Sequence, residues 1–156
     1  MKTIILYATK HGAAGEIAQR IANRMNNTVI HKLGEGDIPS LVDFDCIIIG
    51  SSLYVGMIRK EAKTFLLQNA NVLQEKKFGL FLCGLDASKD KTCFDTNFSP
   101  DILQKAKATG FLGGIFDPQK AGVLERLIMK VVVKKSTYTC TIDNEKIEQF
   151  VEAMNA

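Results

Sequence analysis

The chain has 156 residues and a formal net charge of +3 at pH 7. This length suits one domain that can bury a substantial core, and the charge is too mild to indicate a nucleic-acid-binding protein. No apolar run reaches the roughly 18 residues of a membrane-spanning helix. The N-terminus shows no secretory cleavage pattern, so we expect a cytoplasmic location.

Four cysteines are present, without the CxxC or Cys/His spacing of a metal site, so no metal is expected. Cys46 and Cys83 lie in strongly apolar runs, which favours buried structural thiols. Cys93 lies in a polar segment, where a reactive thiol stays open as an alternative.

Strand and helix patterns alternate along the chain. Apolar runs predict five buried strands, at 2–8, 28–32, 45–50, 78–83 and 111–116. Helical spacing predicts helices at 13–25 and 59–73, one that starts after Ser99, and one that Asp143 caps and that runs to 155. Segments 34–44 and 85–98 are expected to be loops.

The alternation indicates βαβ units, and therefore a parallel sheet with helices on both faces. We expect a three-layer, doubly wound α/β domain over 1–156, with strand order 2-1-3-4-5. In that order a ligand binds where strands 1 and 3 end.

A loop of small residues, Thr9–Gly15, separates the first strand from the first helix. Its backbone N–H groups and the positive helix end favour an anion. The first glycine of a dinucleotide fingerprint is missing, and the second strand ends in Ile30-His31-Lys32 without an acid. A Walker Lys-Ser/Thr, the Cys and Arg of a small phosphatase and the acids of a receiver domain are also missing from the expected positions. An ordinary βα turn without a ligand stays open.

This loop resembles the flavodoxin pattern Thr/Ser-x-Thr-Gly-x-Thr. It reads Thr9, Lys10, His11, Gly12, Ala13 and Ala14, and we call these six residues the phosphate loop. Thr9 and Gly12 match the pattern, whereas His11 and Ala14 replace hydroxyl residues. The resemblance implies that the loop holds the phosphate of FMN, with backbone donors and the side chains of Lys10 or His11 compensating for the missing hydroxyls.

Two further loops carry the same resemblance. The second loop follows the third strand and contains Ser51, Ser52, Leu53, Tyr54, Val55 and Gly56. The third loop follows the fourth strand and contains Cys83, Gly84, Leu85 and Asp86. The resemblance implies that the second loop covers one side of the flavin ring and that the third contacts its edge. Tyr54 either stacks on the ring or is a half-buried loop aromatic, and a solvated acid is favoured over a catalytic one at Asp86. The catalytic residues are unknown.

Segments 48–56 and 124–130 are similar to the flavodoxin-domain group that includes menaquinone-dependent protoporphyrinogen oxidase. As in that group, an extra segment at about 117–142 precedes the last helix. Its stretch 121–135 is amphipathic. One face carries Leu124, Leu127, Ile128 and Val131, and the other carries Glu125, Arg126, Lys130 and Lys134. Met129 and Val133 fall near the polar face, where we expect exposure.

Three functions are consistent with this resemblance. The first is an FMN-dependent oxidoreductase that passes electrons from a reduced substrate to a quinone, as protoporphyrinogen oxidase does. The second is an electron-transfer protein that serves a redox partner protein and has no substrate of its own, although a sequence pI near 8.6 is unlike the acidic shuttles. The third is a non-redox binding module. The amphipathic segment either packs on its own domain or on a second copy, which is favoured, or lies on the inner face of a membrane.

Overall fold

The computed structural model describes residues 1–134 and 136–156, except for the side chains of 132 and 133. Its centre is a parallel sheet with the order β2-β1-β3-β5-β6. These strands are β1 (Thr3–Ala8), β2 (Thr28–Lys32), β3 (Cys46–Tyr54), β5 (Lys77–Cys83) and β6 (Ala108–Phe111). The predicted doubly wound order is confirmed, because the five strands pair as 2-1-3-4-5 in chain order.

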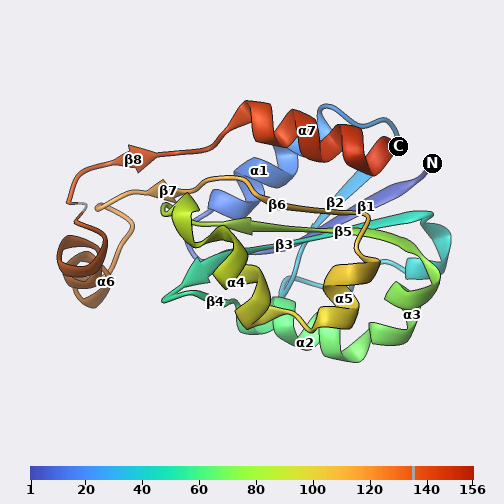
Figure 1. The fold of residues 1–156 in the computed structure, drawn as a ribbon, viewed down its shortest axis with the longest axis horizontal. Coiled ribbons are helices and arrows are strands. Elements are labelled where there is room, and N and C mark those ends of the chain that lie inside the picture. The colour runs from blue at the N-terminus through green and yellow to red at the C-terminus, as the bar shows by residue number, and fades with distance from the viewer. Residues whose placement is uncertain (135) are drawn as a thin grey trace.

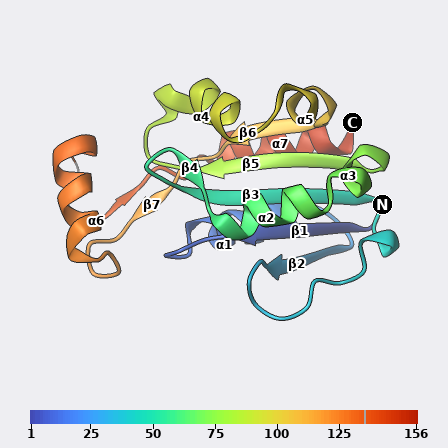
Figure 2. The same cartoon turned by 90° about the horizontal axis from the view of Figure 1, so that it is seen from below.

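Helices cover both faces of this sheet (Figures 1 and 2). The helices α1 (Ala13–Ala22) and α7 (Asn144–Asn155) pack on one face. The other face is covered by α2 (Lys60–Gln68), α3 (Ala70–Glu75), α4 (Asp90–Asn97) and α5 (Pro100–Lys105). Alternate side chains of each strand enter opposite cores, since successive residues of a strand point to opposite faces. In β1, for example, Ile4 and Leu6 join the core under α2, whereas Ile5 joins the core under α1.

The predicted helix caps are confirmed at two places. Ser99 accepts a hydrogen bond from the backbone N–H of Ile102 at the start of α5, and Asp143 accepts from Glu145 and Lys146 at the start of α7.

Two predicted helices were wrong in their extent, and one predicted loop contains a helix. The expected loop 85–98 contains a 3-10 turn, η2 (Ala87–Lys89), and α4, which buries Cys93 and Phe94. Only two side chains of α4 reach the core, too few for helical spacing to show in the sequence. The expected helix 59–73 is two helices, because the backbone leaves helical geometry at Asn69 (φ −118°, ψ 17°). The first helix ends at Ala22, earlier than expected.

The predicted fifth strand, 111–116, was also wrong. The sheet strand β6 ends at Phe111, and β7 (Ile115–Phe116) pairs with β8 (Thr139–Cys140) in a separate antiparallel ribbon. Gly113 turns the chain between them with φ +89°, and a Cβ there would lie 2.0 Å from the carbonyl oxygen of Thr141. Only glycine fits this position, so apolar periodicity across 111–116 does not describe one strand.

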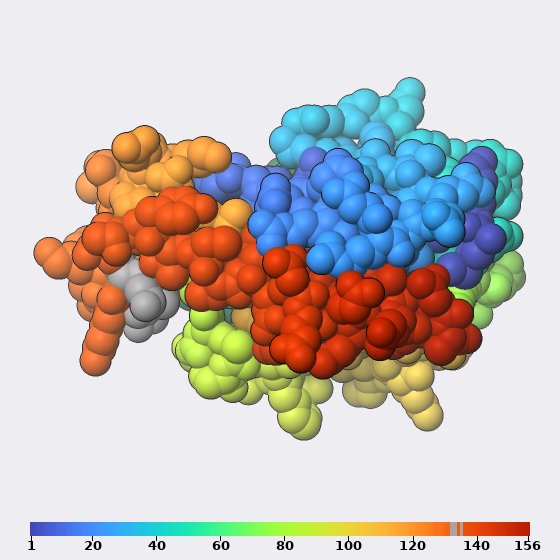
Figure 3. Space-filling model, turned by 90° about the horizontal axis from the view of Figure 1, so that it is seen from above, coloured from blue at the N-terminus to red at the C-terminus, as the bar shows by residue number. Residues whose placement is uncertain are grey.

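Beyond this ribbon the chain forms an arm, residues 117–134 and 136–138, at the edge of the sheet where the parallel strands end (Figures 1 and 2). Figure 3 shows the same arm at one end of the molecule. The arm contains α6 (Val123–Ile128), which continues as a π-helical turn, η3 (Met129–Val133). Among the described residues, no helix is long and apolar enough to cross a membrane.

Candidate functional site

The phosphate loop is a tight turn between β1 and α1. The Thr9 hydroxyl oxygen accepts a hydrogen bond from the backbone N–H of Gly12 at 2.9 Å. Gly12 has φ 101°, a left-handed conformation that favours glycine, and α1 starts at the next residue. Ala14 is fully buried in the core, so its side chain cannot serve a ligand. The start of α1 therefore presents backbone N–H groups and the positive helix end to one side of the loop.

A cavity of about 400 Å³ lies where β1, β3 and β5 end. Every predicted site residue lines it except Gly12, Ala14 and Ser51. Ser51 is buried, and its hydroxyl accepts from the backbone N–H of Arg59 and donates to the carbonyl of Ser52. The parallel strands thus bring the three predicted loops together at one edge of the sheet.

Sequence reasoning missed several residues that line the same cavity. They come from the residue before α2, from η2, α4 and β6, from the turn after β6, and from the arm with its ribbon. Each is far from the predicted loops in sequence or lies in a segment whose structure was predicted incorrectly. These residues are Arg59, Lys89, Cys93, Phe111, Gly114, Ile115, Phe116, Glu125, Ile128 and Met129.

The second loop is a β-hairpin tip. The strand β3 runs to Tyr54, beyond its predicted end, and pairs with the short strand β4 (Met57–Ile58). Val55 and Gly56 form the two-residue turn with φ 48° and 74°, as in a type I′ turn. A positive φ is strained for a β-branched residue such as Val55. The hairpin tip therefore holds a strained, exposed side chain at the rim of the cavity.

One side chain fixes this hairpin to α4. Asn97 accepts a hydrogen bond from the backbone N–H of Ile58 at 2.9 Å and donates to the carbonyls of Gly56 and Cys93, both at 2.8 Å. No sequence pattern indicated this role, because α4 itself was expected to be a loop.

The third loop packs closely on the end of β6 and the turn that follows it. The backbone N–H of Gly84 donates to the carbonyl of Gly113 at 3.1 Å, and a Cβ on Gly84 would lie 2.7 Å from the ring of Phe111. Asp86 accepts from both the hydroxyl (2.5 Å) and the backbone N–H (3.1 Å) of Ser88. These bonds lower the pKa of Asp86. The carboxylate thus caps the η2 turn.

The arm contributes a carboxylate to the phosphate loop. Glu125 forms an ion pair with Lys10, and its Oε2 atom lies 2.6 Å from Nε2 of His11. Its side chain is only 13% exposed. The amphipathic pattern placed Glu125 on an outer polar face, and that expectation was wrong. The ammonium of Lys10 also lies 5.6 Å from the centre of the Tyr54 ring, so this cation links two of the predicted loops.

Met129 was expected to be exposed, but it is partly buried and lines the cavity with Ile128. The matching expectation for Val133 concerns a side chain outside the described part of the structure. The inward face of the arm therefore combines a carboxylate with two apolar side chains.

The imidazole of His11 is held in a cationic environment. Burial is the largest cause that lowers its pKa, and the positive charge of Lys10 is the next. The charges of Arg59 and Lys120 act in the same direction. The negative charge of Asp117 acts in the opposite direction. A neutral imidazole with its proton on Nε2 can still donate to Glu125. His11 therefore supplies a hydrogen bond here, whereas Lys10 supplies a full positive charge.

The thiols at the cavity are not activated. Burial raises the pKa of Cys83 and that of Cys93, which keeps both protonated at neutral pH. The reactive alternative for Cys93 is therefore not supported, because its side chain is buried on α4.

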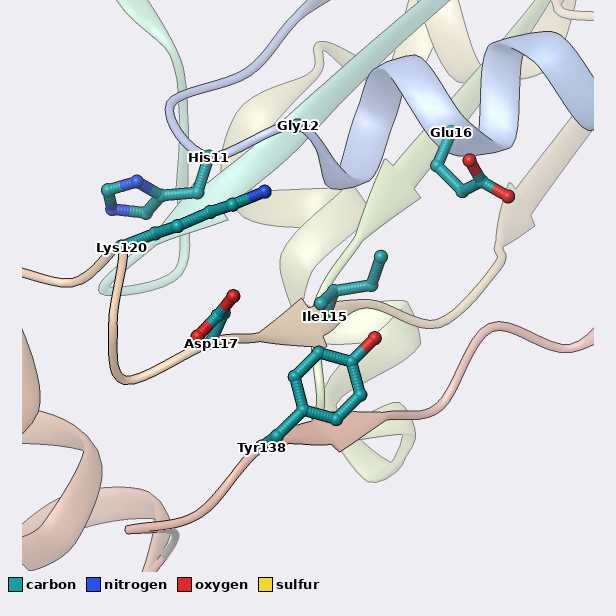
Figure 4. Close-up of a pocket in the computed structure, with 7 residues that line it drawn as sticks. All are labelled: His11, Gly12, Glu16, Ile115, Asp117, Lys120 and Tyr138. Atoms are coloured by element: carbon teal, nitrogen blue, oxygen red, sulfur yellow. The ribbon is translucent and has the colours of Figure 1, made fainter.

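A second, smaller cavity of about 180 Å³ lies beside the phosphate loop (Figure 4). Gly12 lines this cavity instead of the larger one, and His11 and Ile115 line both. Its other lining residues are charged or polar: Glu16, Asp117, Lys120 and Tyr138.

A family model described as a flavodoxin domain matches residues 4–142. The chain belongs to the flavodoxin family. No curated protein matches the chain. Three solved structures share the fold at low identity. A short-chain flavodoxin associated with a non-canonical PDU bacterial microcompartment is 18% identical over 99% of this chain and 97% of that one, with a TM-score of 0.56.

The other two are a flavodoxin and a flavoprotein. The flavodoxin of Streptococcus pneumonia TIGR4 is 15% identical over 99% of this chain and 98% of that one, with a TM-score of 0.55. A flavoprotein of Lactobacillus acidophilus, solved in complex with FMN, is 18% identical over 69% of this chain and 91% of that one, with a TM-score of 0.53. At these identities the flavodoxin-family relationship comes from the family model, and the structures show the shared fold.

Proposed function

We propose that this flavodoxin-family protein binds FMN in the larger cavity and takes part in electron transfer. The observation that carries the proposal is that the three loops with flavodoxin motifs meet around a cavity of about 400 Å³, a size typical of small-molecule sites. The FMN complex of the Lactobacillus acidophilus flavoprotein, which has the same fold, supports the choice of ligand.

The residues present fit a phosphorylated flavin. In this proposal the phosphate loop holds the phosphate through the N–H groups at the start of α1, supported by the cationic Lys10. Ala14 contributes its backbone alone. Tyr54, which is 40% exposed at the hairpin tip, is positioned to contact the ring system. The backbone of the third loop would contact the ring edge, and the bound flavin would supply the redox chemistry.

The cavity is also electrostatically suited to an anion. Lys10, Arg59 and Lys89 line it, and they outnumber its two carboxylates, Asp86 and Glu125. Positive groups around a cleft raise the local concentration of an anionic ligand.

A flavin titration tests this proposal. Adding purified protein to FMN is expected to quench its fluorescence, and Tyr54→Ala is expected to weaken binding. The matched control is Leu67→Ala, which changes an exposed side chain of α2 outside the cavity lining and is expected to bind like the unmodified chain. Unchanged FMN fluorescence with a correctly folded protein would refute FMN binding.

The second candidate function is a protoporphyrinogen oxidase-like transfer of electrons to a quinone. It is favoured by the apolar side chains of Phe116, Ile128 and Met129, which give the cavity a wall suited to an aromatic, apolar reactant. The alternative is an electron-transfer protein that serves only a partner protein. Anaerobic reduction of the FMN-loaded chain, followed by addition of a menaquinone analogue or a one-electron acceptor protein, separates the two. Rapid oxidation by the quinone alone favours the enzyme, and oxidation by the protein acceptor alone favours the carrier.

A further inference from the structure

The outward face of the arm exposes a group of apolar side chains. Val123, Leu124, Leu127 and Val131 are each between 57% and 77% exposed, although they lie within nine consecutive residues of one helical segment. Single exposed apolar residues are common, but a cluster on one helix marks an interaction surface.

The charges around this face have one sign. Arg126, Lys130 and Lys134 are exposed on the same segment. Glu125 is the one acidic residue in the sequence between 118 and 142. It is turned inward and paired with the phosphate loop. The outward face is therefore apolar and cationic, with its negative charge withdrawn into the cavity.

We propose that this outward face docks the protein on an anionic lipid bilayer. Its apolar side chains would enter the boundary between headgroups and acyl chains, and its lysine and arginine side chains would contact anionic headgroups. The arm is suited to this contact because it projects from one end of the molecule (Figure 3), beyond the parallel sheet (Figures 1 and 2). The described helices include none that could cross a membrane, so the contact is peripheral.

A bilayer is favoured over a second copy of the chain by charge. Pairing two arms through these faces would bring Arg126, Lys130 and Lys134 of one copy close to the same cations of the other, and like charges across an interface are unfavourable. The docking does not depend on FMN. If the proposed function also holds, docking would place the cavity near the bilayer surface, because Ile128 and Met129 on the same segment line it.

Vesicle co-sedimentation of the full chain tests the proposal. The chain is expected to bind vesicles that contain phosphatidylglycerol and to stay in solution with pure phosphatidylcholine vesicles, and high salt is expected to release it. Leu127→Glu is expected to lower the partition coefficient at least about tenfold, because a leucine side chain loses its apolar burial and a negative charge is added.

The matched control is Leu67→Glu, which introduces the same change at a 73% exposed leucine on α2 and is expected to bind vesicles like the unmodified chain. Circular dichroism verifies that both variants are folded. Three results would overturn the proposal: no binding to anionic vesicles, equal loss of binding in both variants, or a dimer in sedimentation velocity that Leu127→Glu dissociates while the unmodified chain ignores vesicles.

Discussion

The contact between Glu125 and the phosphate loop predicts how this protein discriminates between flavins. The carboxylate lies 2.6 Å from His11 Nε2 and is paired with Lys10. A phosphate dianion bound by the same loop would share the cation of Lys10 and be repelled by the carboxylate. Glu125→Gln removes the charge and keeps the shape, so it is expected to strengthen FMN binding.

The size of the effect follows from the exposure of the groups. Two unit charges about 4 Å apart interact by about 4 kcal/mol at an effective dielectric constant near 20. Glu125 is 13% exposed, but Lys10 is 47% and His11 34% exposed, so solvent screens a large part of this energy. We expect about 1–2 kcal/mol to remain, which corresponds to roughly 5- to 30-fold in the dissociation constant.

Riboflavin separates this effect from a loosened arm. It has the flavin ring but no phosphate, so any loss of contact with Ile128 and Met129 changes both ligands alike. The assay is fluorescence titration of FMN and riboflavin at low and high salt, with the ratio of the two dissociation constants as the readout. The control Glu148→Gln, which neutralises an exposed acid of α7 paired with Arg24, is expected to leave this ratio unchanged. An unchanged ratio in Glu125→Gln would refute the reasoning.

Further expectations concern stability and thiol reactivity. Asn97→Ala should lower the free energy of unfolding in urea by about 1–3 kcal/mol, because it leaves the backbone N–H of the buried residue Ile58 without its hydrogen bond. A change below a few tenths of a kcal/mol would contradict this role. Val55→Gly should raise the free energy of unfolding by up to about 1 kcal/mol, because glycine adopts a positive φ without strain and this gain exceeds its larger loss of backbone entropy on folding. A lower urea midpoint than that of the unmodified chain would contradict strain at this position. Gly113→Ala should lower the free energy of unfolding by more than about 2 kcal/mol, since the added Cβ would lie 2.0 Å from a carbonyl oxygen. An unchanged free energy of unfolding would show that the turn can move to accommodate the Cβ. With iodoacetamide near pH 8, the exposed Cys140 should react and the buried Cys83 should not, because burial raises the pKa of Cys83 and so reduces the fraction of thiolate. Mass spectrometry of the labelled peptides measures the order of reaction. Labelling of Cys83 before Cys140 would contradict this expectation.

Four of the five sheet strands and the meeting of the three loops could be predicted from the sequence. The apolar runs around Ile5, Ile48 and Leu80 are local signals, because a strand buried on both faces needs apolar side chains on both. Their alternation with helices leads to parallel strands that end at one edge, and this brings Thr9, Tyr54 and Gly84 to one cavity.

The orientation of the arm could not be predicted from the sequence. Helical periodicity put Leu124, Leu127 and Val131 on one face with Ile128, but in the structure the first three are exposed and Ile128 lines the cavity. Local pattern does not say which side turns toward the domain. Leucine and valine side chains normally turn inward, yet here three of them are exposed. Glu125 turns inward instead, to Lys10 and His11, which lie more than a hundred positions earlier in the chain. This pairing requires the chain to leave the sheet after β6. The turn at Gly113 makes that change of direction possible. Local sequence pattern carries no information about a contact between segments so far apart. The contact between the arm and the phosphate loop can therefore be found only in the folded structure.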